Sequence, residues 1–404
     1  MDAKGFGKEI AALRRKCGLT QAALAKMLDI SDKTVSKWES GLGFPDIATL
    51  PSLAEALGVS IDHLFYEKKR GITVAGNLIA DTVNKINAYP SAGKLATIIS
   101  SECSIGGCAA NTAADLAAID RSLPVSVFGC IGDDESGRFI MSKLKSRGID
   151  TSGIRVSRTA ATSFCNVMSV PSGERTFFSH SGANAEFSPR DIDLDKLDTS
   201  ILHIGYLMLL ERFDEPDEEY GTAMARFLAE ASKRGFEISV DAVSSNDREE
   251  YARTIKPTLP YVDYLIMNEI ELCGAFGVEP RRKDGSLDVT ALESAMRAAI
   301  AGGVRKRVIV HTRECGFSLS ADGKMTAIPS LKIPSELIKG NVGAGDAFCA
   351  GALYGIYNGY SDEEMLEFAS GAAATSLLAE NSVDGILCAD EIKKFTARYE
   401  RSIL

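Results

Sequence analysis

The stretch that most constrains this chain is Lys339–Phe348, which reads Lys-Gly-Asn-Val-Gly-Ala-Gly-Asp-Ala-Phe. Small residues run directly into Asp346, and an Ala/Gly/Leu-rich segment with helical spacing follows. A helix start presents unpaired N–H groups and partial positive charge, so it attracts anions. Asp346, beside that start, can accept a proton from a hydroxyl. An anion seat next to a base is what phosphoryl transfer to an alcohol requires.

A second interpretation of this stretch is open. The glycines can simply close a tight turn before a helix, with Asp346 as a capping residue. Short motifs often match by chance, so the Gly-Ala-Gly-Asp sequence alone does not separate the two interpretations. The rest of the chain has to decide between them.

The length of the chain predicts more than one domain, because 404 residues exceed one ordinary hydrophobic core. Hydrophobic residues make up 45% and charged residues 25%, which is the balance of a soluble globular protein. No apolar run has the length of a membrane span, and the N-terminus lacks the apolar segment of a signal peptide. Nine scattered cysteines without a Cys-x-x-Cys pair favour a cytoplasmic protein over a disulfide frame or a zinc site.

The charge is divided unevenly along the chain. Residues 1–70 contain 11 Lys/Arg and 9 Asp/Glu, a net charge of +2, which leaves −12 for the rest of a chain whose total is −10. A slightly basic segment joined to an acidic one indicates two different functions. The acidic part is a poor candidate for polyanion binding, although a local positive pocket can hold one phosphate compound.

Residues 6–66 have the pattern of several short helices. Gly18 ends the first helix, Thr20 caps the second, and Ser31 caps a third at 32–39. Two short helices joined by a tight turn form a helix-turn-helix unit. Two further helices are expected at 46–57 and 60–66.

This segment resembles the Cro/repressor type of helix-turn-helix through Leu19–Ala25, Ser31–Glu39, Gly41, Pro45, Leu53 and Leu57–Val59. In that family the second helix of the pair lies in the major groove of double-stranded DNA. The resemblance implies base contacts from Lys33, Thr34, Ser36 and Lys37, and phosphate contacts from Gln21 and from Arg14 or Arg15. The alternative is a module that binds protein or has lost DNA binding. Trp38 is expected in its core.

A short charged segment that ends at Gly71 predicts a boundary, with domains at 1–70 and 71–404. In the second domain, strands are expected at 72–76, 125–128, 201–204, 237–240, 264–267 and 308–311. Helices are expected at 109–119, 134–147, 218–234, 289–302, 346–358 and 362–379. This alternation predicts an α/β fold of three layers, with a mostly parallel sheet between helices. Ligands of such folds bind at the carboxyl ends of the strands.

Two stretches, near 83–105 and 161–180, break the alternation with extra short strands. In the second stretch, Ser163–Ser169 and Arg175–His180 flank Pro171-Ser172-Gly173, which is a hairpin signal. We expect both stretches to form a small β-sheet that covers a site as a lid.

Seven patches of the second domain follow one another in a fixed order. They are Gly76-Asn77 with Asp81, Gly106-Gly107 before Asn111, Gly129–Asp134 with Gly137, Gly173–Arg175, Asp241, Asn268–Glu271 and Gly343–Asp346. Together they resemble the ribokinase-like (PfkB) carbohydrate kinase family over about residues 71–404. The resemblance implies the ribokinase-like fold and a kinase that phosphorylates a sugar, nucleoside or similar alcohol from ATP with Mg²⁺.

The resemblance also implies roles for individual residues. Asp346 matches the catalytic base, and Gly343, Ala344 and Gly345 match the anion hole. We expect Asp346 to be ionised at neutral pH, because the helix start stabilises its charge. Acceptor-binding positions are matched by Asp81, Gly107, Asn111 and, on the lid, Arg175. A helix cap is the alternative for Asn111, and a solvated surface charge is the alternative for Arg175.

Asn268 and Glu271 match the family's N-x-x-E motif, which helps to hold Mg²⁺ and phosphate, with Glu271 acting on the metal through water. Glu269 is expected at the surface. The nucleotide base is expected near Thr312, Gly316 and Asn381. The four histidines (His63, His180, His203 and His311) show no metal-ligand spacing, and we expect all of them to be structural.

The sequence departs from the family pattern at two places. Gly340 and Asn341 stand where the family usually has Asp-Thr, and that Asp often helps to place a monovalent cation, which counts against activation by K⁺. Arg313 stands where a Gly is common, which alters the nucleotide pocket. Neither change touches Asp346 or the amides before it.

Two functions of different classes fit these observations. One is an active kinase with a DNA-binding head, and the other is a ligand-sensing transcription regulator whose kinase-like domain turns over little. A third account makes the head an interaction module only. Repressor-type heads bind paired half-sites as dimers, and ribokinase-like enzymes often dimerise through their lids, so a homodimer is expected.

Overall fold

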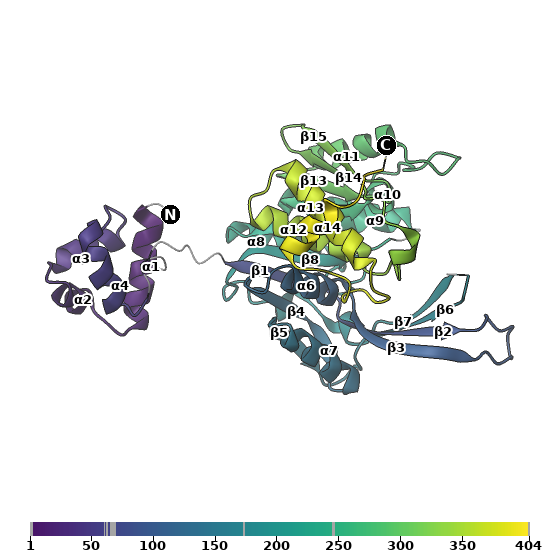
Figure 1. Ribbon diagram of the computed structural model, residues 1–404, viewed down its shortest axis with the longest axis horizontal. Helices are drawn as coiled ribbons and strands as arrows, with labels where there is room; N and C mark the ends of the chain where they lie inside the picture. The colour runs from purple at the N-terminus through teal and green to yellow at the C-terminus, as the bar shows by residue number, and fades with distance from the viewer. Residues whose placement is uncertain are drawn as a thin grey trace. The chain divides into compact units, whose positions relative to one another are not determined.

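The structure is a computed structural model that describes residues 3–59, 61, 64, 70–172, 174–244 and 247–402. The chain divides into two compact units, Met1–Lys69 and Arg70–Leu404, which we call the head and the large unit. Both are drawn in Figure 1. The expected boundary segment 66–69, His63 and Gly173 of the lid hairpin lie outside the described residues.

The head is built from short capped helices. They are α1 (Ala3–Lys16), α2 (Gln21–Met27), α3 (Asp32–Glu39), the 3₁₀ turn η1 (Ile47–Thr49) and α4 (Leu50–Ala56). Thr20 Oγ1 accepts the N–H of Ala23 at 3.1 Å, and Ser31 Oγ accepts the N–H of Thr34 at 3.2 Å, so both expected caps are present. Trp38 is buried in the apolar core, as expected. The helix expected at 60–66 lies mostly outside the described residues.

A nine-stranded sheet forms the middle of the large unit, in the order β15-β14-β13-β12-β11-β8-β1-β4-β5. The parallel strands are β1 (Gly71–Ala75), β4 (Val125–Gly132), β5 (Asp150–Ser157), β8 (Thr199–Leu207), β11 (Glu237–Ala242), β12 (Tyr264–Asn268) and β13 (Arg307–His311). The antiparallel strands β14 (Cys315–Ser320) and β15 (Met325–Pro329) extend one edge. The parallel strands are rich in apolar residues because helices cover both faces.

Helices flank this sheet in two layers, as Figure 1 shows. One face carries α6 (Cys108–Ile119), α7 (Glu135–Ser146), α12 (Ala344–Tyr357), α13 (Asp362–Ser376) and α14 (Ala389–Thr396). The other face carries α8 (Ala223–Lys233), α9 (Arg248–Ile255), α10 (Glu269–Ala275) and α11 (Val289–Ala301). Neighbouring strand residues alternate between the two cores: Val74 packs in the first and Ala75 in the second. The expected three-layer α/β architecture is therefore confirmed.

One expected helix starts later than the pattern indicated. The helix expected at 218–234 begins at Ala223, because β9 (Pro216–Asp217) and β10 (Gly221–Thr222) pair as a short antiparallel hairpin. Gly221 has a positive φ of 86°, which a helix interior does not allow. Thr222 then caps α8 by accepting the N–H of Ala225 at 3.1 Å.

The two stretches that break the alternation form a separate four-stranded sheet, the lid, in the order β3-β2-β6-β7. Its strands are β2 (Ile79–Ile86), β3 (Ile98–Gly106), β6 (Phe164–Ser169) and β7 (Arg175–His180). Figure 1 shows the lid extending away from the main sheet. Among the residues that the structure describes, no helix combines the length and the apolarity needed to cross a bilayer.

Candidate active site

The start of α12 forms the centre of the candidate site. Gly343 precedes the helix in the left-handed conformation (φ 80°, ψ 0°), and a Cβ there would lie 2.6 Å from Ser382. Only glycine fits both conditions. The amide groups of Gly343, Ala344 and Gly345, which we call the anion loop, have no acceptor among the described residues. All three residues are half-buried rather than enclosed, so their N–H groups are available to an anion.

Asp346 lies in the first turn of α12, directly beside the anion loop. Its side chain is buried, with 6% of the residue exposed. Asn111 Nδ2 donates to Oδ2 at 2.8 Å, and the Tyr206 hydroxyl donates to Oδ1 at 3.1 Å and to Oδ2 at 3.3 Å. Two side-chain donors therefore fix the orientation of the carboxyl group.

Burial raises the pKa of Asp346 to about 7, and the charges of Asp241 and Asp81 act in the same direction. The hydrogen bonds from Asn111 and Tyr206 lower that pKa, but burial is the larger effect. The expectation that Asp346 is fully ionised at neutral pH is therefore wrong. A helix start stabilises a charge over one turn only, and here it does not offset the loss of water around the carboxyl group.

Asn111 uses both ends of its amide inside the protein. Its Oδ1 lies 2.9 Å from the hydroxyl of Ser382, while its Nδ2 holds Asp346. Helix α6 is capped by Gly107, so the capping alternative for Asn111 is wrong. Gly107 has a φ of 84°, and a Cβ there would lie 2.4 Å from the carbonyl oxygen of Asn77. Asn111 is therefore placed to orient the Asp346 carboxyl group.

Asp81 lies on β2 of the lid, opposite Ser104 on β3. The adjacent Gly106 makes room for it, because a Cβ at 106 would lie 2.0 Å from Asp81 Oδ2. Burial raises the pKa of Asp81 to about 6. The charge of Asp81 acts on Asp346, so the lid brings a second carboxyl group towards the base.

Arg175 lies further out on the lid. The strand register aligns it with Ser169 and Lys85, four residues beyond the level of Asp81. At about 3.3 Å per residue this is roughly 13 Å along the strands. The structure thus separates Arg175 from the other three acceptor candidates. The Arg175 side chain is half-buried, at the turn end of its strand.

Tyr206 is a site residue that the sequence analysis missed. It follows Gly205 near the end of β8 and has a positive φ of 58°, which is an outlier for a bulky residue. Its amide group donates to Asp241 Oδ1 at 2.5 Å. Neither the strand pattern nor any motif marks a tyrosine there. The only available signal was Asp241 itself, a charged residue in an otherwise apolar strand.

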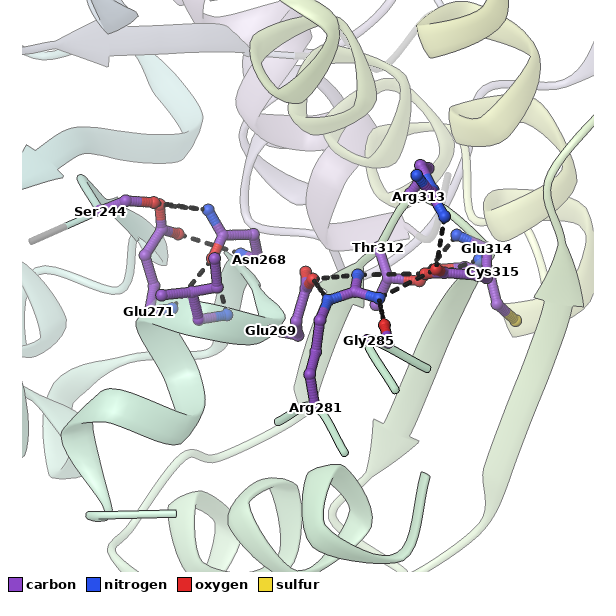
Figure 2. Close-up of polar contacts among 11 residues, drawn as sticks. Ser244, Asn268, Glu269, Glu271, Arg281, Gly285, Thr312, Arg313, Glu314 and Cys315 are labelled. Atoms are coloured by element: carbon purple, nitrogen blue, oxygen red, sulfur yellow. Dashed lines mark hydrogen bonds and ion pairs between the residues drawn. The ribbon is translucent and has the colours of Figure 1, made fainter. Parts of the chain in front are cut away.

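The expected metal and phosphate residues lie at the start of α10, on the left of Figure 2. Asn268 caps the helix by accepting the N–H groups of Ile270 and Glu271, and Glu271 Oε2 accepts the N–H of Asn268 at 2.9 Å. Glu271 Oε1 accepts from Asn268 Nδ2 at 2.6 Å and from Ser244 at 2.9 Å. Burial raises the pKa of Glu271 to about 8. A capping box thus holds this pair in place.

Glu269 is not at the surface, contrary to expectation. It is buried, and Arg281 donates to its Oε1 from Nη2 at 2.5 Å and from Nε at 3.1 Å. The same guanidinium donates to both carboxylate oxygens of Glu314 at 2.9 and 3.1 Å. Figure 2 shows Arg281 between the two acids. This Arg281 clamp ties the start of α10 to the β13–β14 turn.

The three expected nucleotide residues do not lie together. Thr312 closes the β13–β14 turn, where its Oγ1 accepts the N–H groups of Glu314 and Cys315 at 3.1 and 2.9 Å. Gly316 follows in the same turn region, and a Cβ there would lie 3.2 Å from the ring of Phe348. Asn381 instead bonds Asp384 at 2.8 Å and Glu102 of the lid at 3.2 Å.

The anion loop lies between these two places. A Cβ on Gly345 would contact His311, next to Thr312, at 3.2 Å, whereas a Cβ on Gly343 would contact Ser382, next to Asn381. Thr312 and Gly316 thus lie towards the Gly345 end of the anion loop, and Asn381 lies towards its Gly343 end.

One cavity, of about 840 Å³, is lined by Glu186, Arg190, Arg226, Arg234 and residues near them. Asp346 does not line it. The candidate site is identified by its chemistry and by the half-exposed anion loop, and not by the size of a cavity.

Two of the described histidines, His203 and His311, have local partners. His203 is fully buried, with Nδ1 3.1 Å from Ser239 Oγ. Burial lowers the pKa of His311 to about 4, and its ring packs on Phe348 with centroids 5.1 Å apart. One atom each of His203, Asp241 and Cys349 lies within 4.8 Å of the others, a grouping that the scattered sequence positions concealed. All nine cysteines are free thiols, as expected.

In the head, the expected base-reading residues are accessible on α3. Lys33 and Lys37 are exposed, and Thr34 and Ser36 are half-buried. Arg14 is not available to phosphates, because it is buried in an ion pair with Glu39 at 2.6 Å and donates to the carbonyl oxygen of Leu19. That alternative is wrong, which leaves the exposed Arg15.

Gln21 is tied to the same acid as Arg14. Its Nε2 donates to Glu39 Oε2 at 2.7 Å, so its amide nitrogen is already engaged within the head. The start of α2 is thereby fixed against the end of α3, which holds the two helices of the helix-turn-helix pair in a set geometry.

Comparison with known families assigns both units. The model of the pfkB family carbohydrate kinases matches residues 72–386, and a helix-turn-helix model matches residues 10–64. The 5-dehydro-2-deoxygluconokinase of Clostridium perfringens is 26% identical over 298 residues, which cover 72% of this chain and 83% of that protein. The ATP-dependent ribose-1-phosphate kinase of Halopiger xanaduensis is 26% identical over 305 residues, which cover 74% and 89%.

Solved structures show the same fold. An Arabidopsis thaliana ribokinase complexed with ribose and ATP superposes with a TM-score of 0.68 at 21% identity, covering 81% of this chain and 99% of its own. A putative ribokinase II from E. coli with ATP and Mg²⁺ gives a TM-score of 0.65 at 19% identity, covering 81% and 99%. The expected ribokinase-like fold of the large unit is confirmed.

Proposed function

The chain belongs to the pfkB family of carbohydrate kinases and is a phosphotransferase with an alcohol group as acceptor, and from this we propose that it transfers the γ-phosphoryl group of ATP to a hydroxyl of a sugar or nucleoside. The observation that carries the proposal is the position of the Asp346 carboxyl group beside three amide groups that have no acceptor among the described residues.

The transfer follows from this geometry. The acceptor hydroxyl loses its proton to Asp346, its oxygen forms a bond to the γ-phosphorus, and the bond from that phosphorus to the bridging oxygen of ADP breaks. The amides of the anion loop donate to the non-bridging oxygens, whose charge is spread in a loose transition state. Asn111 and Tyr206 hold the carboxyl group in the orientation that receives the proton.

The residues at the start of α10 fit a Mg²⁺ ion held through water. Glu271 is a buried acid whose oxygens are already engaged by Asn268 and Ser244, so direct coordination would break the capping box. Magnesium usually keeps several waters and uses few carboxylates. When bound, the ion neutralises phosphate charge. We assign Glu271 and Asn268 to hold it through its water shell.

On the acceptor side, we assign Asp81 and the backbone at Gly107 to the sugar hydroxyls. Arg175 stays a candidate for a lid contact with acceptor or phosphate. We assign Thr312, Gly316 and Asn381 to the nucleotide, with Thr312 and Gly316 near the Gly345 end of the anion loop and Asn381 near its Gly343 end. Because Gly340 and Asn341 supply no carboxylate, we propose that turnover does not depend on K⁺.

The head is assigned to double-stranded DNA through Lys33, Thr34, Ser36 and Lys37, with Arg15 and Gln21 near phosphates. We propose a cytoplasmic homodimer. Several apolar side chains of the lid are more than half exposed, namely Leu95, Ile98, Ile99, Phe177 and Phe178. An exposed apolar surface of this kind supports pairing of two lids.

The test is a screen for acceptor-dependent ADP release with neutral sugars, sugar acids, sugar phosphates and nucleosides. It is run on the wild type and on Asp346→Asn, and the affinity for DNA is measured with the same compounds. Turnover by the wild type alone supports the proposal. Ligands that bind without turnover and change DNA affinity would contradict it in favour of a sensor.

A further inference from the structure

Tyr206 combines three features, of which the proposed reaction uses only the hydroxyl contact. It is a bulky residue in the left-handed backbone region (φ 58°), its amide donates to Asp241, and its hydroxyl contacts both oxygens of Asp346. A non-glycine residue in that region is strained and persists only where its surroundings enforce it. Such strain gathers at functional sites.

The surroundings that enforce the conformation lie on two adjacent strands. Asp241 Oδ1 accepts the N–H of Tyr206, and Asp241 Oδ2 lies 3.4 Å from His203 Nε2. His203 Nδ1 lies 3.1 Å from the hydroxyl of Ser239, its register partner on β11. All three side chains are buried. A chain of polar contacts therefore leads from Ser239 through His203 and Asp241 to the backbone of Tyr206.

The hydroxyl end of Tyr206 completes a second chain. The hydroxyl donates to Asp346, and Asn111 Nδ2 donates to the same carboxyl group. The Ser382 hydroxyl in turn donates to Asn111 Oδ1. Asp346 is thus oriented by one donor from α6 and one from β8. Within the described part of the chain, the Tyr206 hydroxyl alone donates to Oδ1, because Asn111 donates to Oδ2.

We propose that Tyr206 is a further active-site residue of this kinase, which orders Asp346 as the base by hydrogen bonding, and that Asp241 is the positioning residue that fixes the Tyr206 backbone for this contact. The proposal rests on the proposed function. The hydroxyl does not take the proton of the acceptor. It stabilises the charged form of Asp346 before transfer and keeps that carboxyl group facing the acceptor.

Several other titratable groups face Asp346. They are Asp81 from β2, Cys108 and Asp115 from α6, Asp241 from β11 and Cys349 from its own helix. The ring of His311 on β13 packs close to Gly345. The charges of Asp241 and Asp81 raise the pKa of Asp346, whereas the hydrogen bonds from Asn111 and Tyr206 lower it. Removing the Tyr206 hydroxyl must therefore raise that pKa further.

The experiment is the pH profile of kcat/KM for Tyr206→Phe. A hydrogen bond to a charged group is strong enough to move a pKa by about one unit. The acid limb of the profile should move up by about one pH unit, with roughly tenfold lower kcat/KM at pH 6 and an unchanged KM for ATP. Tyr264→Phe is the matched control, because its hydroxyl bonds Glu237 at 2.7 Å, away from Asp346. An unmoved limb in Tyr206→Phe would overturn the proposal.

Two further measurements keep the result decisive. If Tyr206→Phe folds poorly, 3-fluorotyrosine is placed at position 206 instead. Its hydroxyl is a stronger hydrogen-bond donor, so the acid limb of the profile should move to lower pH. An acid limb that does not move contradicts the proposal. If the wild type has no turnover with any acceptor, the proposed function fails. Carbon-13 titration of the Asp346 carboxyl in wild type and Tyr206→Phe then decides this inference alone: an upward pKa shift supports it and identical titrations refute it.

The role of Asp241 has its own readout. The 11 tyrosines are labelled with nitrogen-15, and the amide signal of Tyr206 is assigned from its loss in Tyr206→Phe. Its proton should lie far downfield in the wild type and move upfield in Asp241→Ala. An amide signal that does not respond to Asp241→Ala would show that another contact fixes the backbone.

Discussion

The buried carboxyl group of Asp346 lowers the stability of the folded protein at neutral pH, and its raised pKa suits it to proton transfer. Its pKa of about 7 lies above the ordinary value of 3.8, so between these pH values the folded protein keeps a proton that the unfolded chain has released. Stability must therefore fall as the pH rises from 4 to 7. A base with a pKa near the working pH can both accept and release a proton, which is what turnover needs.

The first prediction concerns Asp346→Asn. The change removes the cost of a buried charge, so the free energy of unfolding should rise by roughly 2–4 kcal/mol at pH 8 and by much less at pH 4. Activity should fall by about a thousandfold, because the general base is lost. Urea unfolding at the two pH values checks the stability. A variant that is less stable at pH 8 would show that the wild-type carboxyl group is stabilised in its charged form.

The second prediction concerns the space beside Asp81. In Gly106→Ala the new Cβ would fall 2.0 Å from Asp81 Oδ2, so the carboxyl group must move. The KM for the acceptor should rise about tenfold or more, while the KM for ATP stays unchanged. Ser100→Ala, at an exposed position on the same strand, is the control. Equal changes in both KM values would indicate a general loss of lid structure instead.

At the scale of single residues, the motifs predicted which carboxyl group lies beside the anion loop, but they did not predict its burial or its pKa. The match at Asp346 placed the carboxyl group correctly beside the anion loop, but the sequence could not show that 235 residues away Asn111 donates to it. The burial and the raised pKa of Asp346 depend on several strands and helices that meet at one point. Tyr206 was missed because its role arises from a backbone angle, which no residue pattern in β8 encodes.

At the scale of elements, the β13–β14 turn and the start of α10 depend on one another through Arg281. Short motifs predicted each end separately, with Asn268 and Glu271 at one and Thr312 and Gly316 at the other. Arg281 lies in an irregular loop between two helices and belongs to no motif. Long-range ion pairs of this kind are set by the folded chain, so helix and strand patterns do not predict them.

The third prediction tests the Arg281 clamp. Arg281→Met leaves Glu269 buried without its cation, which should lower the free energy of unfolding by about 2–4 kcal/mol. Because the clamp joins the phosphate and nucleotide sides of the site, the KM for ATP should rise while the KM for the acceptor stays constant. The double variant Arg281→Met with Glu269→Gln should recover part of the stability.

Arg297→Met is the control for the clamp. Arg297 bonds Glu293 at 2.6 Å on the exposed surface of α11, and such pairs contribute less than about 0.5 kcal/mol. If both arginine variants lose the same stability, the clamp has no special role.

At the scale of the whole molecule, the alternation of strands and helices predicted the three layers, because hydrophobic periodicity is a local property. The two stretches that break this alternation, one of them with a hairpin signal, predicted the lid. The short helices α9, α10 and α14 were not predicted, since each spans only about two turns. Local patterns thus predicted the layers, and the folded chain determined the site's polar contacts.

The fourth prediction separates the two units. Lys33→Ala combined with Lys37→Ala should weaken DNA binding about tenfold or more and reduce its dependence on salt, because fewer counterions are released. Kinase activity should not change. Lys196→Ala, at an exposed site of the large unit, should alter neither property. DNA binding that persists in the double variant would assign the contact to another surface of the head.

The central claim is that the amides of Gly343, Ala344 and Gly345 hold the moving phosphoryl group while Asp346 takes the proton of the acceptor. The most direct measurement is single-turnover transfer of labelled phosphate from ATP to the best acceptor, by the wild type and by Asp346→Asn, with the affinities for ATP and acceptor measured alongside. We predict that Asp346→Asn binds both substrates with affinities within a few-fold of wild type and transfers the label about a thousandfold more slowly. Transfer at the wild-type rate would contradict the claim.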